Sequence, residues 1–72
     1  MTTLYRIDPE ANMARFYVLS IQPTLFGEWA LVREWGRVGR RPQCLINTYP
    51  TIEHAADATN RLIARKKRRG YC

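Results

Sequence analysis

The hydrophobic pattern changes its period once along the chain, at Pro50, and this change limits the folds that the chain can adopt. Before Pro50, short runs rich in aromatic and β-branched residues are separated by Pro and Gly, which is typical of strands joined by turns. After Pro50 the apolar stripe has helical spacing: Ile52, Ala55, Ala56, Thr59, Leu62 and Ile63. The 72 residues therefore predict one α+β domain over residues 1–72, an antiparallel sheet of about four strands with one C-terminal helix packed on one face.

Turn-forming residues give the expected bounds of these elements. We expect strands at residues 4–7, 15–22, 28–38 and 43–49, a loop at residues 9–13, and a helix from residue 52 to about residue 69. Thr51 is a suitable N-cap, and Gly70 can end the helix. Asp57 and Arg61 are spaced to pair along the helix.

The strand expected at residues 28–38 has two different faces. One face carries Trp29, Leu31, Arg33, Trp35 and Arg37, and the other carries Ala30, Val32, Glu34, Gly36 and Val38. The second set is small and β-branched, so we expect the helix to cover it and to leave Trp35 on an open platform. Two alternatives stay open: Trp35 packs in the core, or a bulge at Gly36 breaks the alternation.

Residues 33–41 concentrate groups that suit nucleic-acid binding. An indole can stack on a sugar or base, an arginine binds phosphate with two donors, and a glycine lets the backbone approach a ligand. The candidate binding residues here are Trp35, Gly36, Arg37, Arg40 and Arg41. The competing interpretation is a core tryptophan with arginines that solvate a turn.

Positive charge is concentrated in the second half of the chain. The net charge is +6, and residues 37–72 hold nine cationic residues against Glu53 and Asp57. One run belongs to the helix end: Arg65, Lys66, Lys67, Arg68 and Arg69. One or two cations would suffice to stabilise the negative end of a helix, so we add the whole run to the candidate binding residues and expect a polyanionic partner. Lys66 projects close to the apolar stripe.

The segment Trp35-Gly36-Arg37-Val38-Gly39 resembles the signature of the WGR domain family. The resemblance includes an aromatic strand, here residues 15–22, and a helix that ends in a lysine followed by Gly-Tyr, here Lys66 and Gly70-Tyr71. It implies a twisted sheet with a helix across it. It also implies that Trp35 packs on the sugar-phosphate backbone near a strand end, as in DNA-dependent poly(ADP-ribose) polymerases. The arginine that Arg37 matches connects DNA to neighbouring domains there, so Arg37 is expected to hold either a phosphate or a partner protein. Many relatives carry glycine where Pro42 stands, so a contact through that amide would be missing.

The sequence offers no catalytic or metal-binding pattern. The single histidine, His54, is expected on the solvated face of the helix, and with two remote cysteines it cannot complete a zinc site. We therefore expect no enzyme, no cofactor and no metal. Cys44 is expected to be a small buried residue, and the absence of a disulfide pattern indicates a reducing compartment. No apolar run is long enough for a membrane helix and no secretory signal is evident, so a soluble cytoplasmic protein is expected.

Two functions remain after these exclusions. The first is a DNA-binding module without sequence preference, which contacts the backbone and prefers ends or breaks. The second is a protein-interaction module whose basic surface docks an acidic partner. Binding that depends on salt and on strand ends would favour the first.

Overall fold

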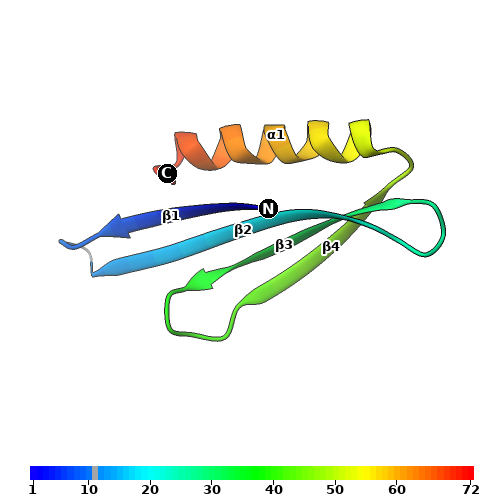
Figure 1. Cartoon of the computed structure of the whole chain (residues 1–72). Coiled ribbons are helices and arrows are strands. Elements are labelled where there is room, and N and C mark those ends of the chain that lie inside the picture. The colour runs from blue at the N-terminus through cyan, green and yellow to red at the C-terminus, as the bar shows by residue number, and fades with distance from the viewer. Residues whose placement is uncertain (11) are drawn as a thin grey trace.

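The computed structural model describes residues 1–10 and 12–72 as four strands followed by one helix (Figure 1). The elements are β1 (Thr2–Asp8), β2 (Met13–Pro23), β3 (Trp29–Arg37), β4 (Gln43–Tyr49) and α1 (Ile52–Arg68). The α+β prediction is confirmed, and each predicted element occurs with ends within two residues of those expected. Of the predicted loop at residues 9–13, Met13 belongs to β2 instead and residue 11 lies outside the described residues.

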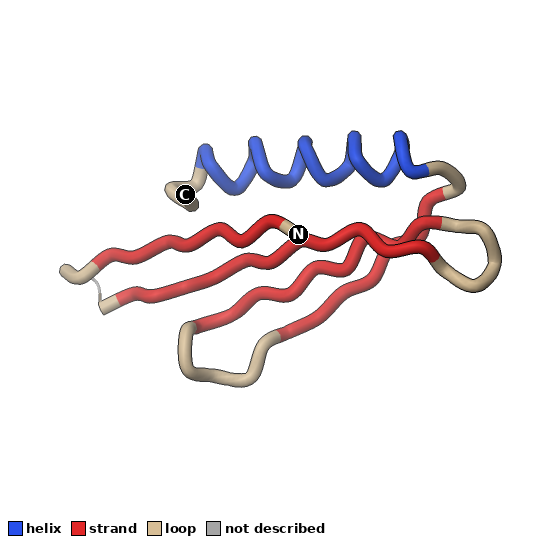
Figure 2. The backbone as a smooth tube through the Cα atoms, in the orientation of Figure 1, coloured by secondary structure: helices blue, strands red, loops and turns tan. Residues whose placement is uncertain are grey.

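The four strands form an antiparallel meander in the order β1-β2-β3-β4. Each strand pairs with its neighbour in sequence, so the sheet needs only short turns. The pairing of β2 with β3 continues without interruption through Phe16 and Gly36, which shows that Gly36 forms no bulge. Helix α1 runs along one face of the sheet (Figure 2).

The helix covers the face of the sheet that carries Trp35. The buried cluster consists of Leu4, Tyr17, Leu19 and Leu31, and the helix packs against it through Ala58, Leu62 and Ile63. Trp35 is half-buried at the edge of this cluster. The expectation that the helix covers the set with Ala30 and Val32 is therefore wrong. Large side chains on three adjacent strands meet on the opposite face, and their burial decides which face the helix takes.

The other face of the sheet has no covering element among the described residues. Alternation places Tyr5, Val18, Val32 and Ile46 there, and Ile46 is 58% exposed. Cys44 lies on this face and is exposed, so the expectation of a buried Cys44 is wrong. It points away from the helix, which is the element that builds the core.

Both ends of α1 are closed by hydrogen bonds from their neighbours. The Thr51 hydroxyl accepts a bond from the His54 amide and lies 2.6 Å from His54 Nδ1. At the other end Gly70, at φ +96°, donates to the Lys67 carbonyl, and Tyr71 donates to the Lys66 carbonyl. These two bonds define a Schellman ending, and the C-cap is Arg69, one residue before the glycine.

The last residues return to the edge of the sheet. The Cys72 amide donates to the Tyr5 carbonyl at 2.8 Å, and the Tyr5 amide donates to the Cys72 carbonyl at 2.9 Å. The two bonds extend the sheet beyond β1 by one short bridge. They also hold Tyr71 over the helix-covered face, where its ring meets Tyr17.

Candidate nucleic-acid interface

An open pocket of about 270 Å³ lies where the end of β3 meets the return of the chain after α1. Its described lining contains four arginines, three other polar or aromatic residues and one glycine: Arg15, Arg37, Arg40, Arg41, Trp35, Gln43, Tyr71 and Gly36. No acidic side chain belongs to that lining. The pocket therefore combines an aromatic surface with positive charge, the two properties that a nucleic-acid backbone requires.

Three arginines lie side by side across the sheet at this end. Arg15 is paired directly with Arg37 on β3 and with Arg6 on β1. We call these three residues the arginine row. Like charges placed directly opposite each other repel, by up to about 1 kcal/mol per pair. A bound anion would turn this repulsion into attraction.

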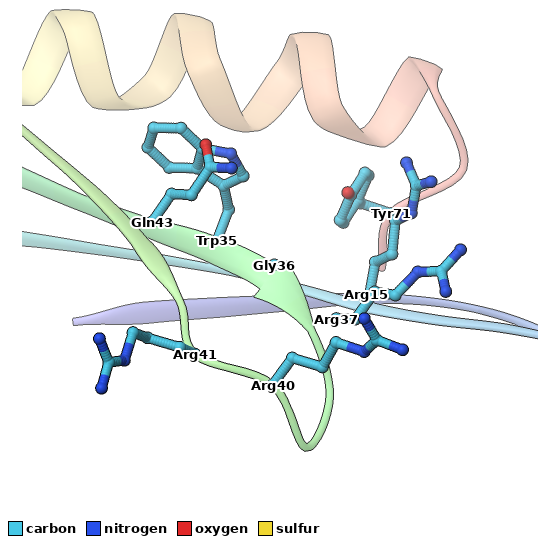
Figure 3. Close-up of a pocket in the computed structure, with 8 residues that line it drawn as sticks. All are labelled: Arg15, Trp35, Gly36, Arg37, Arg40, Arg41, Gln43 and Tyr71. Atoms are coloured by element: carbon cyan, nitrogen blue, oxygen red, sulfur yellow. The ribbon is translucent and has the colours of Figure 1, made fainter.

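Trp35 is both part of the core edge and part of the pocket wall. Its ring stacks on Tyr17 with centroids 5.7 Å apart and an angle of 16° between the planes. Tyr17 also meets Tyr71 edge to face at 6.3 Å. The stack fixes the orientation of the indole while Trp35 remains part of the pocket lining (Figure 3). Trp35 is therefore neither a fully open platform nor a fully buried residue.

Lys66 reaches from the last turn of α1 onto the same aromatic group. Its Nζ lies 4.4 Å from the centroid of the Tyr17 ring and 5.5 Å from that of Tyr71, which is cation–π geometry. Burial lowers the pKa of Lys66, and the nearby charges of Arg69, Arg33 and Arg65 lower it further. Desolvation and like charges both disfavour the charged form of the ammonium group, so the two causes act in the same direction.

The turn between β3 and β4 presents further arginines to the pocket. Gly39 has φ +87°, a conformation that favours glycine, and the Arg40 amide donates to the Arg37 carbonyl at 3.1 Å. Arg37, Arg40 and Arg15 extend toward the end of the pocket where Tyr71 lies, whereas Arg41 points away from them (Figure 3). Pro42 lies close to Gly36, and a Cβ at Gly36 would be 3.6 Å from its Cα.

The structure brings together some of the predicted site residues and separates others. Trp35, Gly36, Arg37, Arg40 and Arg41 all line the pocket, and Lys66 joins them through its contacts with Tyr17 and Tyr71. Arg65 lines a second pocket on the same face. The described linings of the pockets do not include Lys67, Arg68 and Arg69, which are exposed at the end of the helix.

Sequence reasoning did not place Arg15, Gln43 or Tyr71 in the site. Arg15 reaches it because β2 pairs with β3 in a register that sets Arg15 against Arg37, and Gln43 because it pairs with Trp35. Tyr71 reaches it because the Schellman ending turns the chain back over the sheet. The register is a long-range property, but Gly70-Tyr71 after a basic helix end is a signal that could have indicated Tyr71.

The described part of the chain contains no group of three residues that could hold a metal ion. Over the same residues, no helix is both long and apolar enough to cross a membrane. The Asp57–Arg61 pair predicted on the helix is confirmed at 3.1 Å. It is exposed, so it contributes little to stability.

A four-stranded meander covered by one helix, with a tryptophan and arginines at the end of the third strand, defines a small α+β binding domain. The chain belongs to the WGR domain family, because the sequence model of that family matches residues 1–72. WGR domains are a non-catalytic, nucleic-acid-binding type of domain. The family prediction from residues 35–39 is therefore confirmed.

One curated relative is similar in sequence to most of this chain. Uncharacterized protein y4dW of Sinorhizobium fredii is 42% identical over 66 residues. The match covers 92% of this chain and 32% of the relative, so the chain spans about a third of that protein's length. No solved structure matched in the corresponding comparison.

Proposed function

We propose that the domain binds DNA without sequence preference, through the backbone, and favours ends or breaks. The observation that carries this proposal is the arginine row, of which Arg15 and Arg37 line a pocket beside Trp35 whose described lining includes no carboxylate. Phosphate is the ligand that relieves the repulsion within the row, because each guanidinium can donate two hydrogen bonds to it. Trp35 supplies a flat apolar surface for the sugar or base next to that phosphate.

The preference for ends follows from the position of Trp35. Its indole lies against Tyr17 and lines the pocket at the end of β3. A base pair inside a continuous duplex has stacked neighbours on both sides, whereas a terminal nucleotide leaves a surface on which an indole can pack. This proposal rests also on the WGR family membership. It suggests a role in recognising damaged DNA.

The site of action and the partners belong to the same proposal. Cys44 and Cys72 are both free, which suits a reducing compartment, and we place the protein in the cytoplasm. DNA is the proposed partner. Because Arg37 belongs to the arginine row, we favour a contact with phosphate over a contact with a second protein.

The decisive experiment is a titration of blunt, nicked, single-stranded and closed circular DNA at several salt concentrations. We expect non-specific affinities of about 10⁻⁴–10⁻⁶ M at physiological salt, with tighter binding to forms that have ends. Equal affinity for linear and closed circular DNA would refute the preference for ends. No binding to any form at low salt would favour the alternative, an acidic protein partner.

Two variants separate the roles of the arginines. Arg37→Gln and Arg15→Gln each remove one charge from the arginine row, and we expect both to weaken DNA binding and to reduce the salt dependence by about one phosphate contact. Lys67 lines none of the described pockets, so Lys67→Gln is a control for the loss of one charge. Unchanged affinity in Arg37→Gln would instead assign Arg37 to a partner protein.

A further inference from the structure

A second open pocket, of about 380 Å³, lies along the groove between α1 and the β3–β4 half of the sheet. Its described lining is Arg33, Asn47, Tyr49, Ala58, Arg61, Leu62 and Arg65. Three of these are arginines, and none of the seven is acidic. Arg61 is already paired with Asp57 outside the pocket, which leaves Arg33 and Arg65 as the cations available to a ligand.

Arg33 is the unusual residue of this pocket. It is half-buried, on the helix-covered face, between Leu19 of β2 and Leu45 of β4 in the pairing of the strands. Its Nε atom is buried and has no hydrogen-bond partner. A buried donor normally finds an acceptor, because an unmade hydrogen bond in such a place costs stability. The described residues supply Arg33 with no carboxylate either.

The surroundings of Arg33 make an anion the natural partner. Arg33 and Arg65 both lie near Lys66, and the charge of each lowers the pKa of Lys66. A bound anion would compensate several of these cations at once. Asn47 and Tyr49 add a side-chain amide and a phenol on the opposite wall, and both can donate hydrogen bonds to oxygen.

The second pocket is aligned with the first along the same two strands. Gln43 lines the first pocket and Asn47 the second, and both are on β4. Four residues of a strand span about 13 Å, at a rise of about 3.3 Å per residue. Arg33 lies two residues from Trp35 on β3, which is about 7 Å. Duplex DNA rises about 3.4 Å per nucleotide along its axis, so a duplex aligned with these strands places about two to four nucleotides between the two pockets.

We propose that Arg33 and Arg65, together with Asn47 and Tyr49, form a second phosphate subsite that holds the DNA backbone about two to four nucleotides from the end at Trp35. The inference rests on the proposed DNA binding and deepens it, because it assigns a direction and a length to the bound strand. The strand runs from the arginine row, along the groove under α1, toward the end of β4. Arg33 contributes a half-buried guanidinium that has no carboxylate partner among the described residues.

The test is a double-mutant cycle between Arg33 and the phosphates of a blunt-ended duplex. Methylphosphonate linkages replace the second to fourth phosphates from one strand end and so remove their charges, and Arg33→Met removes the cation but keeps an apolar stem. We expect each change alone to weaken binding about five- to tenfold. Combined, they should weaken it little more than one alone, because both remove the same contact.

Two controls keep the result specific. Methylphosphonates at the tenth to twelfth linkages should not be coupled to Arg33→Met. Lys67→Met removes one charge from the exposed end of the helix, and its effect should add to that of either set of methylphosphonates. On unmodified DNA the salt slope of Arg33→Met should be smaller than that of the wild type by about one phosphate contact. When the second to fourth linkages are already neutral, the two proteins should have the same slope.

The outcomes distinguish this inference from the proposed function. If the wild-type protein binds the duplex but Arg33→Met and the methylphosphonates have additive effects, the second subsite is refuted and DNA binding stands. If the wild-type protein binds no DNA, both are refuted. A thermal midpoint that is unchanged or raised in Arg33→Met would confirm that the fold does not depend on the charge. Should Arg33→Met fail to fold, Arg33→Lys provides the same cycle with a cation that lacks the planar fork, and reduced but coupled binding is then expected.

Discussion

At the scale of single residues, the site is built on one aromatic stack. Tyr17 lies in the core, Trp35 stacks on it, and Lys66 contacts its ring. Each of these residues therefore contributes both to folding and to the shape of the pocket. A substitution at Trp35 or Lys66 must be tested for stability and for binding separately.

Trp35→Ala should lower the free energy of unfolding by about 2–3 kcal/mol, because Trp35 is half-buried and a fully buried large aromatic costs about 3–5 kcal/mol on truncation. It should also weaken DNA binding by about 1–3 kcal/mol, the value of one stacked contact. Urea denaturation and a DNA titration measure the two effects. Trp35→Phe retains a ring on Tyr17 and should recover most of the stability. An unchanged stability in Trp35→Ala would contradict the observed stack.

Lys66 makes stability depend on pH in a predictable direction. Its pKa is below the usual 10.5 in the folded protein, so the unfolded chain binds more protons between the two pKa values. Stability contributed by this group therefore rises as the pH increases through that interval. We expect the stability difference between wild type and Lys66→Met to shift in favour of wild type from pH 8 to about pH 10.5. A difference that is constant over this range would contradict the lowered pKa.

At the scale of elements, the end of α1 matters more to the site than its beginning. Thr51 closes the helix far from the pocket, whereas the Schellman ending at Gly70 places Tyr71 against Tyr17. The same ending brings Cys72 to the edge of β1. A local backbone conformation at one glycine therefore positions a wall of the pocket.

Gly70→Ala should destabilise the protein by about 1 kcal/mol or more, because Gly70 has φ +96° and alanine is unfavourable there. A Cβ at this position would also lie 3.5 Å from Arg6 Nε. Thermal unfolding measures the loss, and we expect the affinity for DNA to fall with it as Tyr71 loses its position. Arg69→Ala is the control, since Arg69 has a negative φ of −88°. A neutral Gly70→Ala would show that the helix can end in another way.

At the scale of the whole molecule, the two faces of the sheet differ in charge. By alternation the helix-covered face carries Arg6, Arg15, Arg33 and Arg37 against Asp8, while Glu34 lies on the other face. The exposed cations at the end of α1 add to the positive side. Such a distribution orients the molecule as it approaches a polyanion.

The triple variant of Lys67, Arg68 and Arg69 to alanine tests this long-range effect. The three residues line neither the first nor the second pocket, so we expect the affinity for blunt, nicked and closed circular DNA to fall by the same factor. The salt slope should become flatter, by about 0.9 for each phosphate that loses its partner. A loss confined to DNA with ends would instead assign these residues to the site itself.

The sequence predicted the elements better than their assembly. Local periodicity and the prolines give the strands and the helix, and residues 43–49 and the start of the helix at Ile52 agree with the structure. The face covered by the helix was not predictable from residues 28–38 alone, because both sides of that strand carry apolar residues. The choice depends on Leu4, Tyr17 and Leu19 from other strands. The arginine row likewise exists only through the register of three strands.

The bridge between Tyr5 and Cys72 has a consequence for the order in which the molecule folds. Every other pairing in the sheet joins strands that are consecutive in the chain, so each closes a short loop at little entropic cost. The Tyr5–Cys72 bridge joins the first strand to the last residue and closes the longest loop in the molecule. We therefore expect it to form after the transition state.

Kinetics can reveal this order. Removal of Cys72 should leave the folding rate nearly unchanged and should raise the unfolding rate, as for any contact that is absent from the transition state. Stopped-flow refolding and unfolding in urea measure both arms. A slower folding arm would show that the bridge forms early. With the expected result, the pocket wall at Tyr71 is the last part of the domain to assemble and the first to open.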